Sequence, residues 1–74
     1  MNWSVTTMMN YKVELMMLGK TQMDLMRAIN SRDLGYKCTN VDVCYAMNDV
    51  PRQKFDRIRA DAEMIINEWK AAAT

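Results

Sequence analysis

The stretch GKTQMDLMRAINSRDLGYKCTNVDVCYAMND, residues 19–49, decides the fold because it holds two short helical patterns joined by a polar connection. Each pattern opens with Thr-x-x-Asp, first at Thr21 and Asp24 and again at Thr39 and Asp42. A threonine hydroxyl at this position can accept from a backbone N–H of the first turn, and an acidic residue there favours the positive end of the helix. The sequence therefore predicts that helices start at Thr21 and Thr39.

The spacing of apolar residues around this stretch predicts four helices. They cover about residues 7–18, 21–31, 39–48 and 51–71. Gly19 supplies a stop signal for the first helix, and Pro51 suits the first turn of the last one. Strand signals are absent from the sequence. We therefore expect a compact all-α domain that spans residues 1–74.

Each predicted helix has an apolar face directed at the core. From the first helix to the last, these faces comprise Met8, Tyr11, Leu15 and Leu18; Leu25, Ala28 and Ile29; Val43, Ala46 and Met47; and Phe55, Ile58, Ala62, Ile65, Ile66 and Trp69. In the connection between the second and third helices, Leu34 or Tyr36 is expected to reach the core. The terminal AAAT is expected to fray.

Composition and charge place the chain among soluble globular proteins, since 50% of its 74 residues are hydrophobic, 26% are charged and the net charge is +1. On the last helix, opposite charges spaced for pairing are Arg52 with Asp56 and Arg57 with Asp61. The near balance argues against a protein that coats polyanions by bulk charge. The apolar runs are too short for a membrane span or a signal peptide, so we expect a cytoplasmic protein.

Few residues of this chain suit catalysis or metal binding. There is no histidine, and the only cysteines, Cys38 and Cys44, lack the partners of a zinc site, so we expect them to be packing residues. GKT at residues 19–21 ends like a phosphate-binding loop, but Glu14 stands where that loop needs glycine. The acidic residues lie at helix caps or beside basic partners. We therefore expect no enzyme, no metal and no cofactor.

TQMDLMRAIN followed by GYKCTNVDVCYAMND resembles the helix-turn-helix of the phage-repressor and Cro class, also called the XRE or lambda-repressor-like family. The resemblance covers about residues 11–69 and is nearest to small versions encoded by phages and mobile elements of Gram-positive bacteria. It implies a compact four-helix domain whose third helix reads the major groove of double-stranded DNA.

The resemblance also implies residue roles. Asn40, Val41 and Tyr45 match base-facing positions. Gln22, Thr39 and Asn48 match positions close to DNA phosphates, and Val43 matches the residue that locks the third helix to its neighbour. A basic rim of Arg32, Lys37, Arg52 and Lys54 flanks the third helix and is expected to contact phosphates. The chain departs from the family in its longer connection and in Met26, where a small residue is usual.

These roles predict a transcriptional regulator, a repressor that binds DNA as a homodimer because a few phosphate contacts give a monomer weak affinity. The candidate dimer contacts are Ile66 and Trp69, with Ile65 beside them, although these residues equally suit the core. Asp42 is expected to cap its helix, with acceptance from cytosine as the alternative.

Two other functions stay open. A phage-encoded helix-turn-helix domain can be directed at a protein, as an antirepressor or as an inhibitor of a host defence nuclease such as an anti-CRISPR. The outward face of the third helix, with Tyr45 and Asp42, or the acidic faces of the fourth helix would then meet the protein partner. The other alternative is a plain helical bundle that serves as an oligomerisation module.

Overall fold

A computed structural model describes residues 10–73 of the chain, which form four α-helices and, over that range, no strand. The helices are α1 (Tyr11–Leu18), α2 (Gln22–Ser31), α3 (Asn40–Met47) and α4 (Gln53–Ala73). The expectation of a compact all-α protein is confirmed over this range. None of these helices combines the length and the apolar character that a membrane crossing requires.

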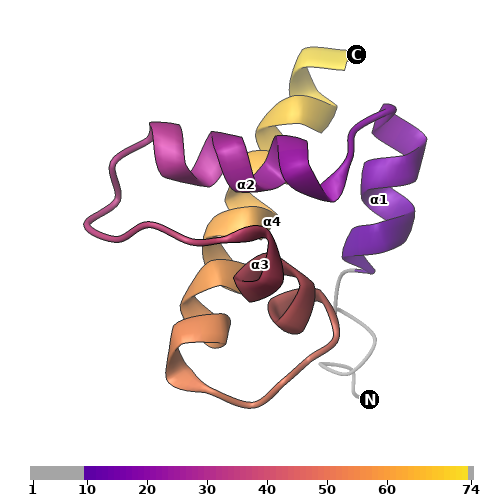
Figure 1. Cartoon of the computed structure of the whole chain (residues 1–74). Coiled ribbons are helices and arrows are strands. Elements are labelled where there is room, and N and C mark those ends of the chain that lie inside the picture. The colour runs from indigo at the N-terminus through magenta and orange to yellow at the C-terminus, as the bar shows by residue number, and fades with distance from the viewer. Residues whose placement is uncertain (1–9, 74) are drawn as a thin grey trace, which may run out of the picture.

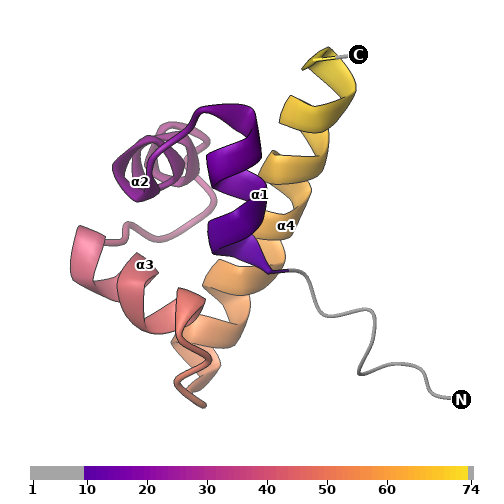
Figure 2. The same ribbon diagram turned by 90° about the vertical axis from the view of Figure 1, so that its right-hand side faces the viewer.

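The long helix α4 is the spine on which the other three helices pack (Figure 1). Helix α1 lies along it, and α2 and α3 also contact it while packing on one another. The axes of α2 and α3 point in different directions: α2 crosses the view in Figure 1 and is seen end-on after the turn in Figure 2. This leaves α3 at one end of the molecule, beside the first turns of α4.

Side-chain caps begin the first three helices. Asn10 caps α1 by accepting from the Val13 N–H at 3.2 Å. Thr21 and Thr39 each form the complete capping box that the sequence predicts. Because Asn10 has extended backbone angles, α1 begins at Tyr11 and not before Asn10 as predicted. The predicted core residue Met8 and the rest of residues 7–9 lie outside the described range.

The ends of α1 and α4 differ in how well they were predicted. Gly19 ends α1 as expected, in the left-handed conformation (φ +69°) that glycine adopts without strain. Helix α4 starts later than predicted, because Pro51 and Arg52 precede it, and it runs through the alanines to Ala73. Alanine has the highest helix propensity, which accounts for the continuation of the helix into a tail that was expected to fray.

The core joins the predicted faces of all four helices. Its fully buried large side chains are Leu25, Ile29, Val43, Ile58, Ile65 and Ile66. Leu34 and Tyr36 of the connection both pack against this core. Ile66, a candidate dimer contact, has no exposed surface and is therefore a core residue in this structure. Trp69 is partly buried, with the Lys20 ammonium 5.0 Å from its ring centroid.

The charges of α4 interact with other elements more than with each other. Arg57 was expected to pair with Asp61, but it donates to the Leu34 carbonyl and lies over the Tyr36 ring at 4.4 Å. Asp61 accepts instead from the Tyr36 hydroxyl at 2.6 Å. Asp56, expected to pair with Arg52, pairs with Arg59. Both i, i+4 predictions are wrong because partners from other elements, or from the same helix turn, lie closer.

Candidate nucleic-acid interface

Helix α3 has one buried face and one open face. Val43, Ala46 and Met47 point into the core, as predicted. On the opposite side Asn40 is exposed, Val41 is 56% exposed and Tyr45 is 48% exposed. The residues predicted to face DNA bases therefore share one accessible surface at the end of the molecule.

The start of α3 is tied to α2 by side-chain hydrogen bonds. The Gln22 amide donates to the Asn40 side-chain oxygen at 2.9 Å and to its carbonyl at 3.2 Å. Asn30, in the last turn of α2, donates to the Cys38 carbonyl and accepts from the Cys38 N–H, both at 2.8 Å. These bonds fix the long connection immediately before Thr39. The role of Asn30 was not predicted, because the sequence shows only a polar residue late in α2.

The other end of α3 is tied to α1 and α4. The Lys12 ammonium donates to the Asn48 side-chain oxygen at 3.0 Å, and the Asn48 amide donates to the Cys44 carbonyl at 2.8 Å. Arg59 donates to the Ala46 carbonyl at 3.0 Å. Neither Lys12 nor Arg59 was identified from the sequence, because contacts over this separation leave no local pattern. Helix α3 is thus positioned at both ends by its neighbours.

Most cations of the predicted basic rim already have partners. Lys54 pairs with Asp42 at 3.1 Å, Lys37 donates to the Asn30 carbonyl at 2.7 Å, and Arg32 pairs with Glu68. The guanidinium of Arg52 makes no hydrogen bond or ion pair with the rest of residues 10–73. Arg52 is the rim cation that a phosphate can reach without displacing a protein partner.

Asp42 serves the helix cap that the sequence predicts. Its carboxylate accepts from the Thr39 N–H at 3.0 Å, and the Thr39 hydroxyl accepts from the Asp42 N–H at 3.1 Å. The Thr39 N–H first, and the Lys54 ammonium after it, hold the pKa of Asp42 below its ordinary value. The carboxylate is therefore ionised at neutral pH and neutralises Lys54, which lowers the positive potential at this end of the interface.

The residues predicted to contact phosphates have different roles in the structure. Gln22, Thr39 and Asn48 all make the internal hydrogen bonds described above, so their first role is to hold α3 in place. Arg52 lies next to the open face of α3, in a pocket of about 370 Å³ that it lines with Tyr45, Val50 and Phe55. The Tyr45 ring packs edge-on against Phe55 at 5.7 Å between ring centroids. Tyr45 and Arg52 therefore form one continuous surface.

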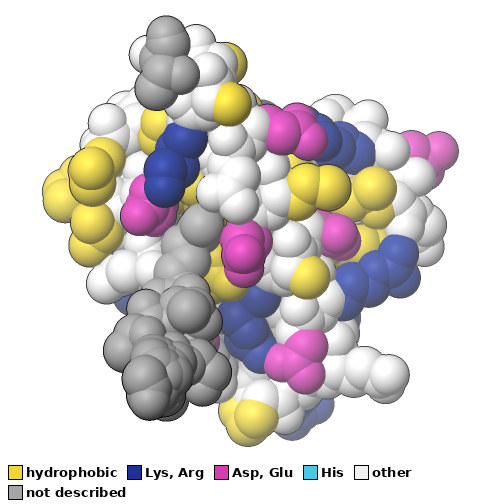
Figure 3. All heavy atoms as spheres, turned by 180° about the vertical axis from the view of Figure 1, so that it is seen from behind, with side chains coloured by type: hydrophobic (Ala, Val, Ile, Leu, Met, Phe, Trp, Pro, Cys, Tyr) yellow, Lys and Arg dark blue, Asp and Glu magenta, His cyan; other side chains and the backbone are white. Residues whose placement is uncertain are grey.

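A second exposed surface is apolar and belongs to α1. Met16 is 72% exposed, Met17 is 75% exposed and Val13 is 40% exposed. In the view from behind, hydrophobic side chains gather at the edge of the molecule where α1 lies (Figure 3). The surface on α1 is separate from the open face of α3.

Both cysteines are free thiols, and neither is fully exposed. Cys38 lies in the core, where burial raises the pKa of its thiol, and Cys44 is partly buried. Residues 10–73 hold no cluster of His, Cys, Asp and Glu that could bind a metal ion.

Comparison with protein-family models, with curated proteins and with solved structures gave no match to this chain.

Proposed function

We propose that this chain is a sequence-specific DNA-binding transcriptional regulator, a repressor of a phage or mobile element, whose helix α3 lies in the major groove. The observation that carries the proposal is the open face of α3, which presents Asn40, Val41 and Tyr45 from a helix tied at both ends. The resemblance to the phage-repressor and Cro class supports it. No cofactor and no chemical step take part.

The side chains of this face have suitable chemistry for bases. An asparagine amide can bond to the edge of adenine through paired hydrogen bonds, and an apolar side chain such as Val41 can contact a thymine methyl group. Gln22 holds the Asn40 amide in one orientation before any ligand arrives. That preorganisation lowers the cost of ordering the side chain when DNA binds.

The phosphate contacts expected of this interface are few. Arg52 is free to bind a phosphate, whereas Lys54 and Lys37 must exchange internal partners for one. Each neutralised phosphate adds a slope of about −0.9 to the dependence of log affinity on log salt. A monomer therefore binds weakly, and we propose that a homodimer on a palindromic site supplies the affinity.

The apolar surface available for that dimer lies on α1. Ile66 is wholly buried, whereas Met16 and Met17 of α1 are the most exposed large apolar side chains within residues 10–73, with Val13 beside them. Met17→Lys is expected to shift the chain toward monomer in analytical ultracentrifugation and to weaken DNA binding. If Met17→Lys left the oligomeric state unchanged, the proposed dimer contact would not lie on α1.

Fluorescence anisotropy of a labelled duplex tests the proposal. The duplex is taken from the DNA upstream of the chain's own gene and is compared with a scrambled duplex, each at low and moderate salt. Preferential, salt-weakened binding to the native duplex is expected. Binding to neither duplex at tens of micromolar protein would overturn the proposal.

Matched variants assign that binding to α3. Asn40→Ala and Tyr45→Ala are each expected to cost about 1–3 kcal/mol of binding free energy. Met23→Ala, at a 41% exposed position of α2, is the control and is expected to leave binding unchanged. Circular dichroism confirms that each variant is folded. Equal losses of DNA affinity in Met23→Ala and in the α3 variants would show that binding does not depend on the open face of α3.

A protein-directed function is the second candidate, because two exposed side chains of α3, Val41 and Tyr45, are apolar or aromatic and most rim cations are paired. Aromatic side chains commonly dominate protein interfaces. An antirepressor or nuclease inhibitor built this way would act without DNA. It would lose its partner on Tyr45→Ala and retain it on Arg52→Gln, whereas the DNA-binding protein would be weakened by both changes.

A further inference from the structure

The pocket of about 370 Å³ beside the open face of α3 is the aromatic hollow. Its lining residues are Tyr45 of α3, Val50 and Arg52 of the loop that follows, and Phe55 in the first turn of α4. Tyr45 belongs to both surfaces, because its half-exposed side chain also lies on the open face. The aromatic hollow therefore continues the surface that the proposed function directs at DNA.

Contacts within the protein hold the walls of the aromatic hollow in place. The Tyr45 ring packs edge-on against Phe55, which is only 7% exposed. The Val50 N–H donates to the Tyr45 carbonyl at 3.1 Å, and the Val50 carbonyl accepts from the Arg59 guanidinium at 3.4 Å. The Arg52 N–H also donates to the Val50 carbonyl, at 3.0 Å. The fold therefore forms the aromatic hollow without a ligand.

The aromatic hollow combines an apolar wall with a single cation. Val50, Phe55 and the Tyr45 ring supply the wall, and none of the four lining residues is acidic. The Arg52 side chain is exposed and has no hydrogen bond or ion pair within residues 10–73. Asp56, the acidic residue four positions after it, is paired on α4. A ligand that suits the aromatic hollow therefore has an apolar group close to an anion.

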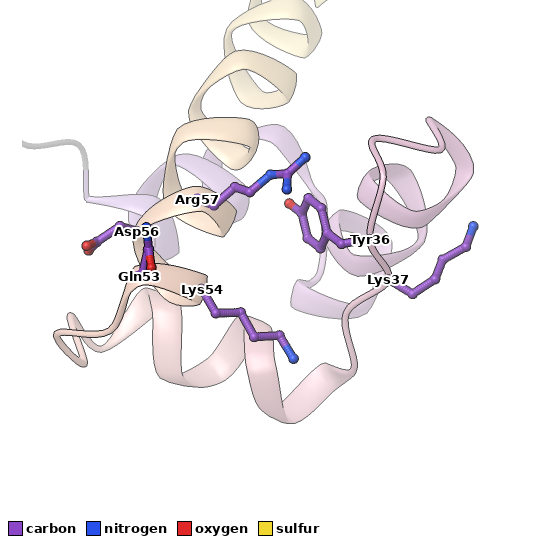
Figure 4. Close-up of a pocket in the computed structure, with 6 residues that line it drawn as sticks. All are labelled: Tyr36, Lys37, Gln53, Lys54, Asp56 and Arg57. Atoms are coloured by element: carbon purple, nitrogen blue, oxygen red, sulfur yellow. The ribbon is translucent and has the colours of Figure 1, made fainter.

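A larger pocket, of about 730 Å³, lies between the connection that follows α2 and the first turns of α4 (Figure 4). Each of its three cations has a protein partner, which holds for Lys37, Lys54 and Arg57. In Figure 4 the Lys37 side chain also points away from the space between the connection and α4. The aromatic hollow differs from this pocket because its one cation, Arg52, is unpaired.

The major groove of DNA offers both parts of such a ligand. Its apolar group is the C5-methyl of thymine, which 5-methylcytosine also carries, and the phosphates beside the groove are anions. A polar base edge against an apolar wall would lose its hydrogen bonds to water without replacement. The C5-methyl group is therefore the feature of the groove that best suits the aromatic hollow.

We propose that the aromatic hollow reads the C5-methyl group of a pyrimidine, while Arg52 binds a nearby phosphate. The methyl group packs against the Tyr45 ring and Val50. Tyr45 thereby discriminates between bases, whereas Arg52 adds affinity for any sequence, because phosphate contacts carry no direct sequence information. This inference rests on the proposed function and adds to it a preference for methylated pyrimidines.

The test compares duplexes with and without these methyl groups. Fluorescence anisotropy measures the affinity for the native upstream duplex and for duplexes in which deoxyuridine replaces thymidine, first at every position and then at one position at a time. The loss of the methyl group that occupies the aromatic hollow is expected to weaken binding about fourfold, the value for burial of one methyl-sized group. A second arm replaces deoxycytidine by 5-methyldeoxycytidine, and a gain of affinity there identifies methylcytosine as the source of the methyl group.

Variants of Tyr45 assign the methyl effect to the aromatic hollow. Tyr45→Ala removes the aromatic wall and is expected to bind the methylated and unmethylated duplexes with equal affinity at that position. Tyr45→Phe keeps the ring and is expected to retain the fourfold difference. Val41→Ala, on the open face but outside the aromatic hollow, is the control and is expected to retain it too. If Tyr45→Ala does not fold, Val50→Thr, which puts a hydroxyl in the apolar wall, is expected to reduce the difference.

Arg52→Gln separates the phosphate contact from the discrimination between bases. It is expected to weaken binding to all duplexes alike and to reduce the dependence of log affinity on log salt by about one phosphate, a slope of about 0.9. The fourfold methyl difference is expected to persist. A methyl difference that disappears in Arg52→Gln and survives in Tyr45→Ala would overturn the assignment of the methyl group to Tyr45.

The outcomes distinguish this inference from the function on which it rests. If the chain binds the native duplex but neither deoxyuridine nor 5-methyldeoxycytidine changes the affinity, the inference fails and the proposed function stands. A methyl effect that survives in folded Tyr45→Ala, or in Val50→Thr where that variant is used, would also overturn the inference. If the chain binds no duplex, the proposed function and the inference fail together.

Discussion

Helices α2 and α3 open with the same four-residue cap, but their surroundings differ. In α2, the Asp24 side chain is partly exposed and forms an ion pair with Arg27 of the same helix, at 3.9 Å. In α3, Asp42 pairs with Lys54 of α4 at 3.1 Å. The same local signal therefore starts both helices, while the second cap also joins α3 to another element.

The two helices also differ in what holds them. Two large side chains of α2, Leu25 and Ile29, are fully buried, so this helix is held by its apolar face. Helix α3 buries Val43, Ala46 and Met47, and hydrogen bonds from Gln22, Lys12 and Arg59 also hold its two ends. A helix that is fixed by its inner face and also at both ends keeps its outer face free for a partner.

The largest effect is expected from the cores of the two helices. Leu25→Ala in α2 is expected to lower the free energy of unfolding by about 2–5 kcal/mol, because it leaves a cavity at a fully buried site. Val43→Ala in α3 removes less carbon and is expected to cost less. Urea denaturation followed by circular dichroism measures both values. A larger loss of unfolding free energy in Val43→Ala than in Leu25→Ala would contradict the expectation that apolar packing stabilises α2 more than α3.

A smaller effect is expected from the polar anchor of the connection. Asn30→Ala removes both hydrogen bonds to the Cys38 backbone and is expected to cost about 1–3 kcal/mol of unfolding free energy. Ser31→Ala is the matched control, since the Ser31 hydroxyl bonds only within α2, to the Ala28 carbonyl. Chemical denaturation of both variants measures the difference. Similar costs would mean that the bonds to Cys38 do not hold the connection.

The two caps are expected to respond to acid by different amounts. Backbone hydrogen bonds from Thr21 and Thr39 lower the pKa values of Asp24 and Asp42 from their ordinary value of 3.8. Because the folded-state pKa is lowered, each carboxylate contributes its full stabilisation above the ordinary pKa of 3.8, and the contribution is lost as the pH falls from there through the folded-state pKa.

Asp42→Asn is expected to remove more of this acid sensitivity than Asp24→Asn, because Asp42 also pairs with Lys54. The free energies of unfolding at about pH 6 and about pH 3, on either side of the ordinary Asp pKa, measure the change. Equal acid sensitivity in the two variants would show that the link to α4 adds nothing to the second cap.

The smallest effect is expected from the cations beside the caps. Lys54→Gln is expected to cost no more than about 1 kcal/mol, since the ammonium is half-exposed and water screens the pair. Arg27→Gln is expected to cost less, because its pair with Asp24 is longer and more exposed. Denaturation at low and high salt measures both variants. A salt-independent loss in Lys54→Gln would contradict an electrostatic origin.

The helices and their buried faces followed from the sequence because caps and apolar spacing are local signals. The Thr21 and Thr39 capping boxes and the stop at Gly19 each depend on residues within one turn. The buried face of α4 was likewise predicted correctly, from Phe55 to Ile66.

The tertiary partners of polar side chains did not follow from the sequence. Arg57 was assigned to Asp61 by spacing along α4, but the fold brings the Leu34 carbonyl and the Tyr36 ring closer. The pocket beside these residues was missed for the same reason. The open face of α3 was predicted because exposure on a helix follows the same period as burial, whereas the partners of Lys37 and Lys54 depend on the packing of three elements.

The most direct test of the claim that α3 is the recognition surface is an amide-shift map of the ¹⁵N-labelled chain on addition of its native upstream duplex. The largest shifts are expected at Asn40, Val41 and Tyr45, with little change at the exposed Met23 of α2. Shifts of equal size on α2 and α3, or no shift beyond that given by a scrambled duplex, would contradict the account.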